Sequence, residues 1–106
     1  MIYSAKCYFC FTRQLNEKGE VGYEQRIVLL DAKNEDEAIN LAENEATRYA
    51  KKHKAVFLDF IEVFKLFENN IDLDMITEVY SLTMYDDPDQ EEFLNNYYLT
   101  GGNISP

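Results

Sequence analysis

Tryptophan is absent from this chain of 106 residues, which also has only one histidine, two cysteines and four glycines. Two cysteines are too few for a disulfide framework, and a structural zinc site needs four ligands. No glycine-rich phosphate loop, Walker sequence or nucleophile elbow occurs. The one histidine, His53, has no local partner for nucleophilic catalysis. These absences predict a protein that is not an enzyme, with no catalytic residues, no metal and no cofactor.

Basic residues are absent from the last part of the chain. All ten Lys and Arg lie at or before Lys65, where eleven acids nearly balance them. Residues 66–106 hold nine acids and no base, and so carry most of the net charge of −10. Such a field repels phosphate backbones and anionic lipids, so nucleic acid and membranes are poor partners. Its electrostatic complement is a protein with a basic surface, although acids also keep proteins soluble.

Long hydrophobic runs are absent as well. No segment approaches the roughly 20 apolar residues that a membrane-spanning helix needs. The opening MIYSAKCYFCF has no basic region before its apolar residues, and Lys6 interrupts them, which is not the pattern of a signal peptide. We therefore expect a cytoplasmic protein with a single domain, because a second core does not fit in this length.

Alternating apolar and polar residues predict two strands in the first third of the chain. Residues 2–12 alternate throughout, and residues 23–32 form a second strand after the polar loop QLNEKGEVG. Strands joined by so short a loop pair antiparallel. Cys7 and Cys10 are three apart on the first strand and point to opposite faces. They can neither bond to each other nor share a metal, and we expect Cys7 to be packed in the core.

Residues 34–54 carry the clearest helix signal. Asn34 is suited to cap the first turn, with Glu37 three residues later as its capping-box partner. Acids crowd the first turn and lysines the last, which matches the helix dipole. The apolar residues recur at spacings of three and four and form a narrow, alanine-rich stripe, so the helix should lie close against a sheet. They are Ala38, Leu41, Ala42, Ala46, Tyr49 and Ala50.

Residues 55–67, AVFLDFIEVFKLF, form a third predicted strand whose two faces are both apolar. Coverage on both sides is typical of central strands, so we predict a central position. One helix covers one face only, so Phe57, Ile61 and their neighbours need another cover. The candidates are the C-terminal segment and a second copy of the protein. The turn ENNIDLD leads to a fourth predicted strand at residues 75–85.

Two acids interrupt the apolar third strand. Asp59 and Glu62 are three apart, so they face opposite ways and are poorly placed for a catalytic carboxylate pair. Acids in such positions more often meet a base on a neighbouring strand. We expect Lys6 or Arg26 to be that base.

The C-terminal stretch MYDDPDQEEFLNNYYLT predicts a short helix. Asp87 is placed to cap it, Pro88 suits the first helical position, and Gln90 has the capping-box spacing. A helix of about ten residues is marginal alone, so it should form only when docked on the sheet. Its apolar stripe would be Phe93, Leu94, Tyr97 and Tyr98, and Gly101-Gly102 would end it.

The predicted fold class is therefore α+β with the order β-β-α-β-β. Four mainly antiparallel strands form one sheet, with one long helix on one face and a short C-terminal helix. Residues 1–85 form the sheet-plus-helix domain. Residues 86–106 are an acidic extension with a short helix and belong to the same domain.

Several of these segments resemble a bacterial family of small cytosolic proteins that is catalogued as a domain of unknown function. The segments are YSAK, YEQRIVLLDAKNEDEAINLAE, EVF and TEVYS, in that order. The resemblance covers about residues 2–82 and leaves out the acidic tail. The chain departs from the pattern at Ile2, where a Trp commonly precedes the Tyr. The resemblance implies a stand-alone cytosolic protein and brings no catalytic residues.

Three functions are compatible with these features. The first is a non-enzymatic acidic protein that neutralises or regulates a basic protein partner, as toxin-immunity proteins do. Its predicted contact residues are Asp86, Asp87, Asp89, Glu91, Glu92, Tyr97 and Tyr98. The second is a self-associating module, plausible as a homodimer through the apolar third strand. The third is a small-molecule or enzymatic role in a pocket between the sheet and the tail.

Overall fold

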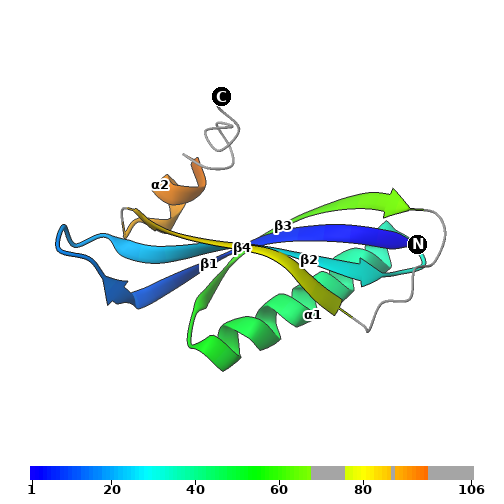
Figure 1. The fold of residues 1–106 in the computed structure, drawn as a ribbon, viewed down its shortest axis with the longest axis horizontal. Coiled ribbons are helices and arrows are strands. Elements are labelled where there is room, and N and C mark those ends of the chain that lie inside the picture. Colours follow the sequence, from blue (N-terminus) through cyan, green and yellow to red (C-terminus); the bar gives the residue numbers. More distant parts are fainter. Residues whose placement is uncertain (68–75, 87, 96–106) are drawn as a thin grey trace.

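The structure, a computed structural model, describes residues 1–67, 76–86 and 88–95. Its elements are β1 (Ile2–Leu15), β2 (Val21–Asp31), α1 (Glu35–His53), β3 (Val56–Phe67), β4 (Ile76–Asp86) and α2 (Gln90–Leu94). The strands form one antiparallel sheet in the order β3-β1-β2-β4. α1 packs against one face, and α2 stands on the other face near one end (Figure 1). The α+β architecture predicted from the sequence is confirmed.

The β1–β2 hairpin forms the centre of the sheet. Its register runs from Ile2 opposite Asp31 to Phe11 opposite Gly22. The side-chain oxygen of Asn16 accepts hydrogen bonds from the backbone N–H groups of Lys18, at 3.0 Å, and Glu20, at 2.9 Å. These bonds fix the turn with an Asx-type arrangement. The predicted antiparallel pairing of the first two strands is confirmed.

α1 begins at the predicted cap. The side-chain oxygen of Asn34 accepts a hydrogen bond from the backbone N–H of Glu37 at 2.8 Å. The Glu37 carboxylate reaches back to the N–H of Lys33 at 3.2 Å. The buried face consists of Ala38, Ala42, Ala46 and Ala50. These small side chains allow the helix to approach the sheet closely, as the alanine-rich stripe predicted.

β3 lies at one edge of the sheet, so the prediction that it is central was wrong. Apolar residues on both faces do not require burial on both faces, since Phe64 is largely exposed, and they carry no information about the position of a strand in the sheet. The prediction that the helix leaves Phe57 and Ile61 without cover was also wrong. Phe57 and Ile61 pack beneath α1 with Phe9, whereas Leu58 packs on the opposite face beside Phe93. The tail therefore does not cover Phe57 and Ile61.

α2 begins two residues later than predicted. Its cap is Asp89, whose carboxylate accepts hydrogen bonds from the N–H groups of Glu91, at 3.0 Å, and Glu92, at 3.2 Å. The prediction that Asp87 caps this helix was wrong, because the free N–H groups of its first turn donate to Asp89. The predicted docking on the sheet is confirmed for Phe93, which is fully buried.

Candidate functional site

Four of the five predicted acidic contact residues are described by the structure, and they lie at one end of the molecule. Asp86 ends β4 opposite Val21, and Glu91 and Glu92 are exposed in the first turn of α2. Asp89 is exposed too, but its carboxylate caps the helix. We call these four acids, Asp86, Asp89, Glu91 and Glu92, the acidic end. Three other predicted contact residues, Asp87, Tyr97 and Tyr98, lie outside the described residues.

Phe93 holds the acidic end in place. Its ring stacks on Tyr23 with the centroids 3.7 Å apart and the planes 2° apart. It also meets the Tyr8 ring edge-on at 5.6 Å. Aromatic contacts of this kind add to the free energy gained by burial. Because α2 is too short to be stable alone, this anchor determines where Glu91 and Glu92 are presented.

A buried network of charged and polar side chains joins α1 to β2 and β4. It was not predicted from the sequence. Arg26 donates from Nε to Glu78 at 2.6 Å and from a terminal nitrogen to Glu45 at 3.0 Å. Its guanidinium also lies 3.8 Å from the centre of the Tyr49 ring. The Tyr49 hydroxyl donates to both oxygens of Glu24, at 2.7 and 3.0 Å. Ser81 donates to the same carboxylate.

The protonation states in this network follow from its contacts. Hydrogen bonds from Arg48 and then Arg26 outweigh burial and hold the pKa of Glu45 below its ordinary value. Burial, together with the Glu24 carboxylate, raises the pKa of the Tyr49 phenol. Tyr49 therefore remains a donor to Glu24. Each charge of Arg26 and Glu45 has an opposite partner, which indicates a structural tie between helix and sheet.

One signal in the sequence pointed to this network. Glu24 and Arg26 alternate with Val28 and Leu30, so all four share the face of β2 that packs beneath α1. Two charges on a buried face require partners. Glu45 and Tyr49, one turn apart on α1, supply them. The expected pairing of Lys6 with Glu62 is confirmed at 3.3 Å, while Arg26 pairs with neither strand acid that the sequence suggested.

The cysteines show no arrangement for metal or redox chemistry. Cys7 packs beneath α1 and Cys10 packs with Phe93 on the opposite face, so their predicted separation is confirmed. Burial raises the pKa of the Cys7 thiol to about 12, which keeps it protonated and unreactive. Within residues 1–67, 76–86 and 88–95, no cluster of three or more His, Cys, Asp or Glu side chains is placed to hold a metal ion.

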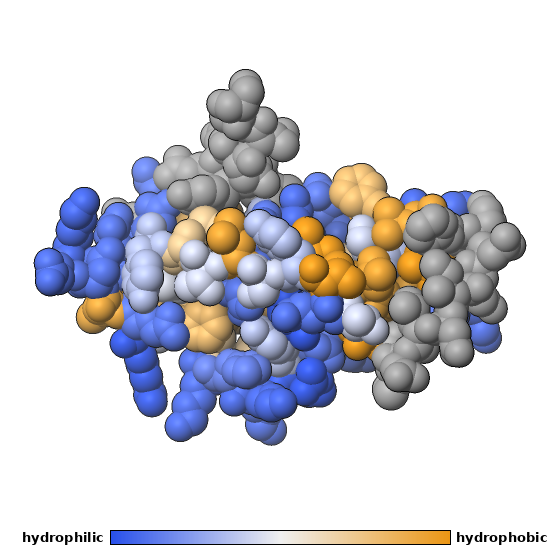
Figure 2. All heavy atoms as spheres, viewed as in Figure 1, coloured by the Kyte–Doolittle hydropathy of each residue, from blue (hydrophilic) through white to orange (hydrophobic). Residues whose placement is uncertain are grey.

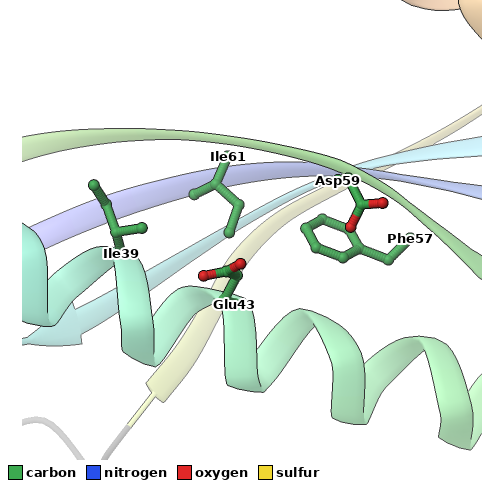
Figure 3. A pocket seen from close by; sticks show the side chains of 5 residues that line it. All are labelled: Ile39, Glu43, Phe57, Asp59 and Ile61. Carbon is green, nitrogen blue, oxygen red and sulfur yellow. The ribbon is translucent and has the colours of Figure 1, made fainter.

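A groove opens between α1 and the outer edge of β3. Its volume is about 220 Å³, and its lining residues are Ile39, Glu43, Phe57, Asp59 and Ile61. Figure 3 shows the two carboxylates beside the same space, Glu43 from the helix and Asp59 from the strand. The third of the functions compatible with the sequence would place a pocket between the sheet and the tail instead. In the structure, Phe93 occupies the space over Tyr8 and Tyr23.

Large hydrophobic side chains are exposed on both edge strands. On β3, Phe64 is 56% exposed, and on β4 Tyr80 is 43% exposed and Leu82 is 45% exposed. The pairing places Tyr80 opposite Ile27 and Phe64 opposite Ser4, on the face that carries α2. Figure 2 shows hydrophobic surface along β4 in the middle of the view. Exposed residues of this size favour association with another surface.

No helix in the part of the chain that the structure describes is long and apolar enough to cross a membrane. No protein-family model, curated protein or solved structure matches the chain. The resemblance to a bacterial family of unknown function therefore remains a prediction from the motifs alone.

Proposed function

We propose that this protein is a non-enzymatic binding protein for a basic protein partner, which it neutralises or regulates in the manner of a toxin-immunity protein. The observation that carries the proposal is the acidic end. Phe93 fixes α2 to the sheet, and Glu91 and Glu92 face solvent from it. No Lys or Arg follows Lys65 in the sequence to offset them.

Capping explains only part of this acidity. Asp89 has a local function, and any acid in the first turn of a helix gains from the helix dipole. Asp86 lies outside the helix, at the end of β4, and the base-free stretch spans residues 66–106. An extended field of one sign speeds association with an oppositely charged partner and helps to exclude other proteins. This supports a binding role for the acids more than a role in solubility alone.

Reversing the exposed charges of α2 tests the proposal. The double variant Glu91→Lys/Glu92→Lys is expected to lose at least tenfold in affinity for the basic partner at low salt, and less at high salt, because salt screens exposed charges. Partners captured from a lysate of the source cell would be identified by mass spectrometry. Their affinities would then be measured by surface plasmon resonance at two salt concentrations.

A matched control is available on the other helix. Glu35 and Asp36 are also exposed acids in a first helical turn, and α1 packs on the opposite face of the sheet. Glu35→Lys/Asp36→Lys makes the same change of charge and loses the same interaction with a helix dipole. It is expected to leave partner affinity within about threefold of the wild type, because salt screens charges that lie far from the bound partner. Equal losses in the two variants, or none in either, would remove the proposal.

Self-association is the second candidate function, and the exposed hydrophobic residues of β4 favour it. In a homodimer, Tyr80 and Leu82 would be covered by the second copy. Light scattering at 10–100 micromolar protein separates the two functions. The acidic binding protein is expected to be a monomer, because a charge of −10 on each copy opposes association. A dimer mass that Leu82→Lys returns to a monomer would instead establish self-association.

A further inference from the structure

We propose that the groove between α1 and β3 binds one arginine or lysine side chain of a protein partner. The identity of that partner rests on the proposed function, whereas the chemistry of the groove does not. The groove lies beneath the edge of β3, on the α1 face, and is separate from the acidic end on α2. It would be a second point of contact, one that recognises a side chain by shape as well as by charge.

The shape of the groove follows from an irregularity in β3. Phe57 pairs with Phe9 and Ile61 pairs with Cys7, so three residues of β3 stand opposite one residue of β1. Asp59, in the middle of the three, has a left-handed backbone with φ of 54°. A bulge of this kind bends the strand and re-aims a side chain. It keeps Phe57 and Ile61 on the α1 face and brings the Asp59 carboxylate to the rim above them.

The helix supplies the opposite wall. Ile39 and Glu43 are four residues apart on α1 and therefore lie on the same side of it. Figure 3 shows the Glu43 carboxylate below Ile61, with Ile39 on one side and Phe57 on the other, and the Phe57 ring next to Asp59. Three of the five lining residues are apolar and two are carboxylates. An aliphatic chain that ends in a cation matches this lining, because its stem can contact the apolar side chains and its charge can pair with the carboxylates.

The two carboxylates have no competing partner among the residues that the structure describes. Within the described residues, neither Glu43 nor Asp59 takes part in a hydrogen bond or an ion pair. By contrast, Glu62 and Glu45 are each paired with a base. Two unpaired acids beside an apolar groove attract a cation that can also bury its stem. The Phe57 ring offers a π face to the same charge.

Size and ligand type exclude other occupants. A volume of about 220 Å³ is below the roughly 300–1,000 Å³ of pockets for drug-sized ligands. A calcium ion takes six to eight oxygen ligands, and two carboxylates among apolar side chains do not supply them. A phosphate or carboxylate ligand would be repelled. One basic side chain fits the available volume, the apolar walls and the charge.

The experiment uses two small probes of the same shape, one charged and one neutral. Pentylguanidinium carries the guanidinium group of arginine on an aliphatic chain two carbons longer than that of arginine, and pentylurea is its neutral counterpart. Each is titrated into the ¹⁵N- and ¹³C-methyl-labelled full chain and followed by NMR. We expect saturable shifts at Ile39, Phe57 and Ile61 with pentylguanidinium, and at least tenfold weaker binding of pentylurea. Equal binding of the two probes, or no saturable shift at these residues, would overturn the proposal.

A double variant tests the carboxylates directly. Glu43→Gln/Asp59→Asn keeps the side-chain shapes, and Asn tolerates a left-handed backbone as well as Asp does. It is expected to weaken pentylguanidinium binding at least tenfold. The control Glu91→Gln/Glu92→Gln removes the same charge from α2 and should change this binding by less than twofold. Glu91 and Glu92 belong to the acidic end, so the control also tests the proposed function. A loss of partner affinity in the control, with probe binding unchanged, would show that the acidic end and the groove act independently. Unchanged probe binding in Glu43→Gln/Asp59→Asn would contradict the proposed role of the groove, even if the acidic end binds its partner as proposed.

Discussion

Replacing Phe93 with alanine is expected to lower the free energy of unfolding by about 3–5 kcal/mol. The ring is fully buried, stacks on Tyr23 at 3.7 Å and meets Tyr8 edge-on. Its removal leaves a cavity over two large aromatic rings. A five-residue helix cannot hold itself in place without that contact, so α2 should leave the sheet. Urea unfolding gives the free energy, and the near-ultraviolet circular dichroism of tyrosine reports the loss of packing around Tyr8 and Tyr23.

Phe64 provides a control with the same chemical change. It lies on the same face of the sheet but is 56% exposed, so Phe64→Ala removes much less buried area and should cost well under half as much. Similar losses in the two variants would contradict the assignment of Phe93 as the anchor of α2. Phe93→Ala should also weaken binding of the basic partner, because the acidic end would no longer be held in a fixed position.

The arrangement of β3 shows where local sequence patterns stop being informative. Alternation in the first two strands and the alanine stripe of the helix depend on neighbours within a few residues, and both were predicted correctly. The order of strands in a sheet depends on contacts between distant segments. Which face of β3 meets α1 depends in the same way on where the helix crosses the sheet, and the alternation within β3 does not specify it. The bulge at Asp59 adds two residues, an even number, so Phe57 and Ile61 stay on one face.

The candidate sites also differ in how far the sequence could predict them. The acidic end was predictable because its charge is a property of composition, and Glu91 and Glu92 are exposed as expected. The groove was not predictable, since Glu43 and Asp59 are 16 positions apart in the sequence and meet only through packing of α1 on β3. The buried network was partly visible, because Arg26 shares a face with Val28. Its partners on α1 and β4 become apparent only in the folded chain.

Replacing Arg26 with methionine is expected to lower the free energy of unfolding by about 1.5–3 kcal/mol at pH 7, the contribution typical of hydrogen bonds between charged groups. Arg26 is 8% exposed and is the cation shared by Glu45 and Glu78. Methionine preserves much of the apolar stem but removes the cation from Glu78 and one of the two cations from Glu45, which keeps its pair with Arg48. Arg48→Met is the control, because Arg48 also pairs with Glu45 but its side chain is 57% exposed. It should change stability far less, since exposed ion pairs contribute little.

The effect of pH separates lost charge pairing from lost packing. The pKa of Glu45 in the folded protein is held below its ordinary value of 4.5, first by Arg48 and then by Arg26. A lowered pKa gives stability that is present above pH 4.5 and is lost as the pH falls through the folded value. Arg26→Met removes part of that contribution, so the gap between wild type and variant should be widest at neutral pH and should narrow below pH 4.5. Urea unfolding of both proteins from pH 7 to pH 3 measures this gap. A gap of constant size would show that Arg26 stabilises the fold through contacts that do not depend on the ionisation of Glu45, such as that of its guanidinium with the Tyr49 ring.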